Sequence, residues 1–128
     1  MSIEIYQKQT VMPVVAEKLG TPTILDNGDT APVLERLETA HARRLDIHIK
    51  QSAAGGITSV SIRSYTAGRL WYHQYQVQGG IAPTTYCIVV GEPYSNGTQE
   101  FALGDTIDVV VANGIDNNTI HVWAIARS

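Results

Sequence analysis

The 128-residue sequence has one cysteine, one phenylalanine and two tryptophans. A lone cysteine cannot form an intrachain disulfide, and the apolar run 86–90 around Cys87 predicts that this thiol packs as a small hydrophobic side chain. Positive charge is also scarce, because nine Lys and Arg against twelve Asp and Glu give a net charge of −3. This balance disfavours nucleic-acid binding, since phosphates require a basic surface.

Long hydrophobic runs are missing as well. The first twenty residues contain Glu4, Lys8 and Glu17, and no apolar stretch there is long enough for a signal peptide or a membrane span. We therefore expect synthesis in the host cytoplasm without a signal peptide, and no membrane partner.

The sequence does contain many short runs of β-branched and aromatic residues, separated by turn residues at intervals of about ten. Apolar and polar residues alternate in 45–50, 58–64 and 119–126, which predicts half-buried strands. The first two of these strands are expected to pair as a hairpin across Gly55 and Gly56. With 44% hydrophobic residues, the chain can build one core, which at this length buries roughly two-thirds of the unfolded surface.

The first third of the chain is less regular, because Pro13, Pro22 and Pro32 confine it to edge strands, first positions or extended arms. Segment 31–44 is compatible with a helix, although strand or turn is favoured. We expect an N-terminal arm or edge strand over 1–20 and a β-sandwich over 21–128. Without crossover helices, the sheets must be antiparallel, which predicts a jelly-roll or Greek-key sandwich of about eight strands with an extended N-terminal arm.

Catalytic and metal-binding patterns are not recognisable in the sequence. His41, His48, His73 and His121 have no metal-ligand spacing, and surface or stacking roles are favoured over a zinc site. The run 26–29, Asp-Asn-Gly-Asp, is better explained as a tight turn than as a calcium loop. No serine lies in a nucleophile elbow and no glycine-rich loop precedes a Lys-Ser/Thr pair, so we expect neither enzymatic activity nor a cofactor.

A group of aromatic residues is the strongest indication of a binding surface in the sequence. Trp71, Tyr72 and Tyr75, with Trp123, could stack on sugar rings, as aromatic faces do in carbohydrate-binding sandwiches. A place in the core or in a subunit interface is the favoured interpretation of the same residues. Glycan or receptor binding through Trp71, Tyr72 and Tyr75 remains the alternative.

Three stretches carry a resemblance: 44–52, 70–75 and, above all, 101–113 followed by 120–124. In strand rhythm and turn placement they resemble the small jelly-roll proteins that decorate or cement the heads of tailed bacteriophages. The resemblance covers about residue 45 to the end and includes no single diagnostic residue.

The resemblance implies a structural virion protein on the capsid exterior that binds the major capsid protein and assembles with itself, as a homotrimer. It also implies that the N-terminal arm reaches neighbouring capsid subunits. The arm residues expected to make capsid or subunit contacts are Ile3, Ile5, Tyr6, Val11, Met12 and Val14.

Overall fold

The computed structural model describes residues 12–67, 69–91 and 103–128, with the backbone alone for 69–75. The described chain forms nine strands and no helix. They are β1 (Val14–Leu19), β2 (Thr23–Leu25), β3 (Thr30–Glu38), β4 (Arg44–Gln51), β5 (Ile57–Thr66), β6 (Arg69–Gln78), β7 (Thr85–Gly91), β8 (Thr106–Asn113) and β9 (Asn118–Arg127). The expected all-β fold is confirmed, and segment 31–44 is a strand and turn.

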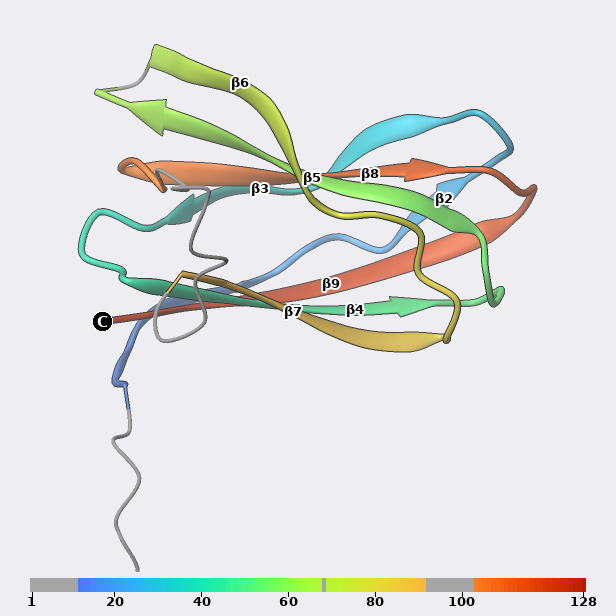
Figure 1. The fold of residues 1–128 in the computed structure, drawn as a ribbon, viewed down its shortest axis with the longest axis horizontal. Coiled ribbons are helices and arrows are strands. Elements are labelled where there is room, and N and C mark those ends of the chain that lie inside the picture. The colour runs from blue at the N-terminus through green and yellow to red at the C-terminus, as the bar shows by residue number, and fades with distance from the viewer. Residues whose placement is uncertain (1–11, 68, 92–102) are drawn as a thin grey trace, which may run out of the picture.

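The strands form two antiparallel sheets that lie on top of one another (Figure 1). The first sheet has the order β1-β9-β4-β7, with β2 also paired to β9, and we call it sheet A. The second has the order β3-β8-β5-β6, and we call it sheet B. All named pairings are antiparallel, as expected for a chain without crossover helices.

The core lies between the sheets and is built from the inward residues of the alternating strands. In β4, Leu45, Ile47 and Ile49 are buried, whereas Lys50 is exposed. The same alternation holds in β9, as the sequence predicted. The core residues of β5, β8 and β9 are Ile57, Val60, Ile62, Ile107, Val109, Val111, Ile120, Val122, Ala124 and Ala126. Burial of such aliphatic side chains is the main stabilising contribution to a fold of this kind.

The expected hairpin between 45–50 and 58–64 is wrong. These segments become β4 and β5, which lie in different sheets. The link between them crosses the sandwich, and the Gln51 side chain holds it there: its Nε2 donates to the Ile81 and Pro83 carbonyls (both 2.8 Å), and its Oε1 accepts the Ile57 N–H (3.0 Å). The buried Gln51 amide thus joins the end of β4 in sheet A to the start of β5 in sheet B, and all its polar atoms have partners.

A buried amide cluster extends this contact into the loops at the same end of the sandwich. Asn118 Nδ2 donates to Gln51 Oε1 and to Asn113 Oδ1, both at 3.0 Å. Asn113 Nδ2 in turn donates to the Asp26 carbonyl at 3.0 Å. All three amide side chains are buried, and their mutual bonding satisfies polar atoms that would otherwise be costly to bury.

The last strand ties the C-terminus into the sheet, as expected. The Ser128 N–H donates to the Pro13 carbonyl at 2.9 Å, so the start of β1 and the end of β9 lie side by side. The described residues include no helix that is long and apolar enough to cross a membrane.

Candidate binding surfaces

The large hydrophobic side chains most exposed in the described chain lie on three strands of sheet A. Val14 is 46%, Val15 44% and Leu19 74% exposed in β1; Ile24 is 67% exposed in β2; and Trp123 is 39% exposed in β9. β1 and β2 both pair with β9 and form the outer border of the sheet. We call Val14, Val15, Leu19 and Ile24 the N-terminal edge. Exposed apolar side chains on the border strands of a sheet are a typical site of protein association.

The predicted capsid-contact residues fall partly on this edge. Val14 belongs to it, and Met12, which is half-buried, lies just before β1. Ile3, Ile5, Tyr6 and Val11 lie outside the described residues. The strand predicted as one possibility for 1–20 is present over Val14–Leu19, with five residue pairs registered against β9.

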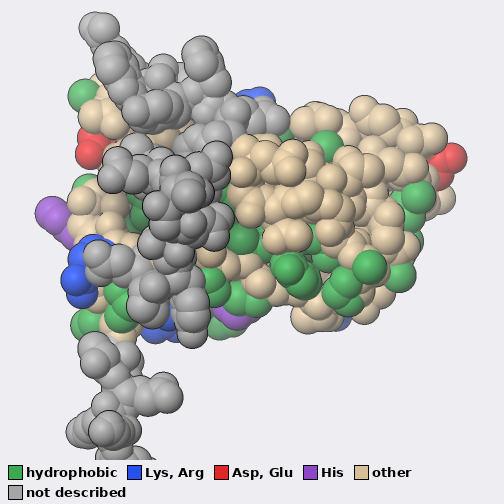
Figure 2. Space-filling view, in the orientation of Figure 1, with side chains coloured by type: hydrophobic (Ala, Val, Ile, Leu, Met, Phe, Trp, Pro, Cys, Tyr) green, Lys and Arg blue, Asp and Glu red, His purple; other side chains and the backbone are tan. Residues whose placement is uncertain are grey.

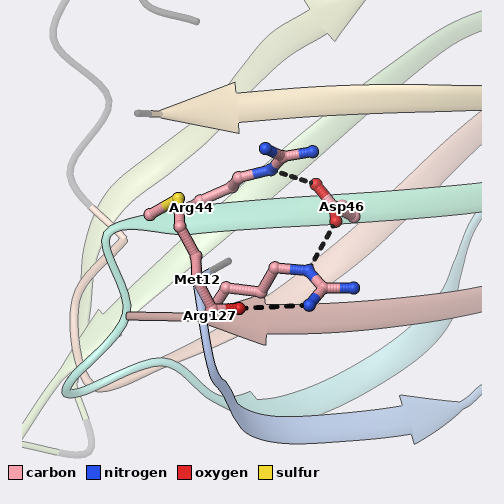
Figure 3. Close-up of polar contacts among 4 residues, drawn as sticks. All are labelled: Met12, Arg44, Asp46 and Arg127. Atoms are coloured by element: carbon pink, nitrogen blue, oxygen red, sulfur yellow. Dashed lines mark hydrogen bonds and ion pairs between the residues drawn. The ribbon is translucent and has the colours of Figure 1, made fainter. Parts of the chain in front are cut away.

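A buried carboxylate fixes the start of the N-terminal edge (Figure 3). Asp46, whose side chain is 7% exposed, accepts from Arg44 Nε at 2.6 Å and from Arg127 Nε at 2.9 Å. Arg127 Nη1 also donates to the Met12 carbonyl at 3.1 Å. Asp46 thereby links β4 and β9, and through Arg127 it also fixes Met12, the residue that leads into β1.

The outward face of sheet A carries a shallow hollow next to this edge. Cross-strand register places His48 opposite Trp123 and Lys50 opposite His121, so these four side chains form a two-by-two block on β4 and β9. The His48 and Trp123 rings are stacked, with centroids 5.1 Å apart and planes at 29°. The hollow measures about 170 Å³, and its lining consists of Leu19, Gly20, His48, Ile49, Lys50, Thr85, His121, Val122 and Trp123. We call it the Trp123 hollow.

The lining of the Trp123 hollow combines apolar side chains with basic ones. Lys50, His48 and His121 are the ionisable side chains in its lining, and none of the lining residues is acidic. The Glu17 carboxylate, which accepts the Trp123 indole N–H at 3.2 Å, is not part of the lining. The hollow therefore favours a negatively charged group in a protein whose net charge is −3.

The sequence had assigned Trp123 to the core or to a subunit interface, and the core assignment is wrong. Its neighbours on β9 alternate inward, which leaves Trp123 on the solvent face. That orientation was readable from the alternation in 119–126. The partnership with His48 was not, because it depends on the pairing of β9 with β4.

The alternative glycan-binding residues lie together on β6. Register pairs Tyr72 with Ser64 and Tyr75 with Ile62, and Trp71 precedes Tyr72 on the same strand. β6 borders sheet B, so these positions are remote in topology from the Trp123 hollow on sheet A. Their side chains lie outside what the structure describes.

A second hollow, of about 180 Å³, separates the borders of the two sheets. Its lining comes from 18–23 and 32–35, and the Lys18 ammonium group donates across it to the Glu35 carbonyl. Because the Lys18 ammonium group is already bonded within the protein, it is less suited to bind a ligand in this hollow.

Cys87 is exposed on β7, so the predicted burial of this thiol is wrong. The register places it opposite His48 on the outward face of sheet A, because the inward positions of β7 are taken by Ile88 and Val90. Partial burial, with a smaller contribution from Asp46, raises the pKa of the Cys87 thiol. A thiol with a raised pKa forms less of the nucleophilic thiolate, so this residue is poorly suited to covalent chemistry.

A second buried carboxylate lies in sheet B. Asp108 accepts the Tyr65 hydroxyl at 2.7 Å and the Arg36 backbone N–H at 2.9 Å. Arg36 has a left-handed backbone (φ 58°) in an irregular part of β3, and its guanidinium lies 3.8 Å from the centre of the Tyr65 ring. The hydrogen bond to Asp108, together with burial, raises the pKa of Tyr65. These contacts fasten the β3 bulge to β8 and β5.

The turn at 26–29 uses its carboxylates internally. Asp29 Oδ2 accepts the Asp26 N–H at 2.8 Å, and Asp26 Oδ1 accepts the Asn117 N–H at 3.0 Å, which confirms the predicted turn. Across 12–67, 69–91 and 103–128, no three His, Cys, Asp or Glu side chains lie where they could hold a metal ion together. The stacked His48 and the exposed His41 and His121 agree with the predicted surface or stacking roles.

The basic side chains on the part of the molecule turned toward the viewer lie mainly at one end, whereas acidic side chains are visible at both ends (Figure 2). Figure 2 shows most of the visible Lys and Arg side chains toward the end that holds the C-terminus in Figure 1.

Comparisons with protein-family models, with curated proteins and with solved structures gave no match for this chain.

Proposed function

We propose that this chain is a non-enzymatic structural protein of a virion, a decoration or cement protein that binds the exterior of a capsid as an oligomer. The observation that carries the proposal is the N-terminal edge, where four large apolar side chains are 44–74% exposed on a border of sheet A. Exposed apolar surface of this kind on a small domain indicates a protein-binding site.

The strand pairings support a jelly-roll topology for the same chain. β2 pairs with β9, β3 with β8, β4 with β7, and β5 with β6. This is the order of one long hairpin, bent at β5–β6 and rolled into two sheets. Jelly rolls occur in viral capsid proteins and lectins, among other classes, so the topology is compatible with the proposal without specifying it.

The environment of the buried carboxylates supports a structural role. Asp46 bonds two arginines, and Asp108 bonds Tyr65 and a backbone N–H. Each acts as an acceptor that joins strands. We infer that attachment to the capsid occurs through buried surface at the N-terminal edge, with the N-terminal segment as an arm. Self-association in a trimer would cover other border strands of the two sheets.

The proposal is tested by co-sedimentation of the purified protein with capsids assembled from the major capsid protein of the same genome. Wild-type protein is expected to sediment with the capsids, and the double variant Val15→Asp/Leu19→Asp is expected to remain in the supernatant. Thr58→Asp/Thr66→Asp, which places the same two negative charges at exposed positions of β5 in sheet B, is the matched control and should bind like wild type.

Two results would contradict the proposal: failure of the wild-type protein to bind capsids, or undiminished binding by the folded double variant. Removal of residues 1–11 tests the arm separately. This truncation keeps β1 intact, and it is expected to weaken binding without unfolding the sandwich. Removal of 1–20 is unsuitable because it deletes β1.

Glycan or receptor binding is the second candidate function. The Trp123 hollow favours glycan binding, because it offers an exposed aromatic side chain next to polar groups. This site is on sheet A, whereas the aromatic residues first considered for glycan binding lie on β6 in sheet B.

A further inference from the structure

We propose that the Trp123 hollow binds a single acidic sugar ring, such as a uronic or sialic acid residue of a glycan. The inference does not depend on capsid attachment, because the hollow lies on the outward face of β4 and β9 and shares only Leu19 with the N-terminal edge; Val14, Val15 and Ile24 are not part of its lining.

Size sets the first constraint on the ligand. A volume of about 170 Å³ is below the roughly 300–1,000 Å³ of pockets that enclose drug-sized molecules. The hollow therefore accommodates one ring or one side chain and leaves the remainder of a larger ligand in solvent.

The arrangement of polar groups distinguishes a sugar from a peptide side chain. The Trp123 indole, supported by the stacked His48 ring, offers an aromatic surface. Lys50 and Thr85 lie opposite each other in the β4–β7 register, and Lys50 is also opposite His121 in β9. Thr85, Lys50 and His121 thus form one row of hydrogen-bonding groups across β7, β4 and β9, beside the row that holds His48 and Trp123. A pyranose can stack its apolar face on Trp123 while several hydroxyl groups along one edge face this row, whereas an acidic side chain has only one polar end.

Charge selects an acidic sugar over a neutral one. Lys50 contributes a full positive charge, two imidazoles lie beside it, and the lining contains no carboxylate. A carboxylate on the sugar ring would be attracted to Lys50, and the attraction should weaken as salt is added, because exposed charges are screened.

The test is an NMR titration of the full-length protein with N-acetylneuraminic acid and with glucuronic acid, with galactose and glucose as neutral comparisons. Saturable shifts are expected at Lys50, His121 and the Trp123 indole N–H, the last assigned from its loss in Trp123→Phe. Lys50→Gln should weaken acidic-sugar binding by about fivefold and bring it near the neutral sugars. Lys18→Gln removes the same charge outside the hollow and should leave the affinity unchanged.

Three outcomes would overturn the inference. They are the absence of saturable shifts with both acids, equal affinity for neutral sugars, and equal shifts with a tetraglutamate peptide, which would indicate a site for acidic peptide. Because Lys50 is exposed, Lys50→Gln should fold normally even if Trp123→Ala does not. Capsid binding by Lys50→Gln should equal that of wild type, so failure here is distinguishable from failure of the attachment proposal.

Discussion

Asp108 shows how a single buried side chain can shape a strand. Its carboxylate accepts two donors, and one of them is the backbone N–H of a residue with positive φ. A non-glycine residue in this conformation is uncommon and requires compensating contacts. We attribute the irregular register of β3 opposite β8 to this contact.

The Asp108 contact leads to a prediction about stability. Asp108→Asn should destabilise the protein by about 1–3 kcal/mol, because an amide replaces an acceptor of two hydrogen bonds. The substitution should also lower the pKa of Tyr65 toward its ordinary value, since the hydrogen bond to Asp108 is the largest cause of the rise. Denaturant unfolding and ultraviolet titration, with Tyr65→Phe as reference, measure the two effects. An unchanged Tyr65 pKa would contradict this explanation.

The same contact predicts a loss of stability in alkali. Because the pKa of Tyr65 is raised in the folded state, the unfolded chain loses this proton first as the pH rises. The contribution of the Tyr65 hydroxyl to the free energy of unfolding should be fully present below about pH 10. It should disappear as the pH rises through the pKa of Tyr65 in the folded protein. Wild type should therefore lose more stability than Tyr65→Phe above pH 10. Parallel stability curves for the two proteins would contradict the prediction.

The strand borders are held together by a close backbone contact at Gly20. A Cβ atom on Gly20 would lie 2.1 Å from the Val33 carbonyl oxygen, between the end of β1 and β3. Gly20→Ala should destabilise the protein by about 1–3 kcal/mol, because the two borders would have to separate. Gly79→Ala is the control, since its nearest neighbour would be a flexible side-chain atom at 3.8 Å. Thermal unfolding should show a loss for Gly20→Ala alone, and equal effects would contradict the contact.

The Asp46 clamp makes a prediction about β1. Asp46→Ala removes the acceptor shared by Arg44 and Arg127 and should cost about 1–3 kcal/mol, less than a fully buried pair because both arginines are partly exposed. Arg127 would also lose its orientation toward Met12. Hydrogen exchange over 14–19 should accelerate more than exchange in β5. Uniform acceleration in all strands would show that Asp46 does not hold β1 specifically.

Strand positions could be predicted from the sequence where local alternation determines them, as in 45–50 and 119–126. The pairing of strands could not. β4 lies beside β9, some 70 residues later, and the Gln51, Asn113 and Asn118 amides bond to one another at one end of this pair, but no local sequence pattern encodes either contact. For the same reason the Trp123 hollow could not be predicted: its outward residues were recognisable one by one, but not as neighbours. The predicted burial of Cys87 was wrong because an apolar run on an edge strand does not have both of its faces buried.

The whole molecule is an antiparallel sandwich with a strongly apolar border. Its described core residues are buried between the two sheets, whereas the most exposed large hydrophobic side chains of the described residues gather on β1 and β2. Strands that expose such groups at a border are usually covered in the functional state. The whole-molecule account is therefore attachment through the N-terminal edge, with the Trp123 hollow as an adjacent second site that shares only Leu19 with this edge.

Electron cryo-microscopy of capsids assembled with and without this chain is the most direct measurement of that account. We predict density for the two-sheet sandwich on the outer capsid surface, with β1 and β2 against the shell or against a second copy, and with the outward face of β4 and β9 open to solvent. Absence of the chain from the capsids, or contact through sheet B with β1 and β2 exposed, would contradict it.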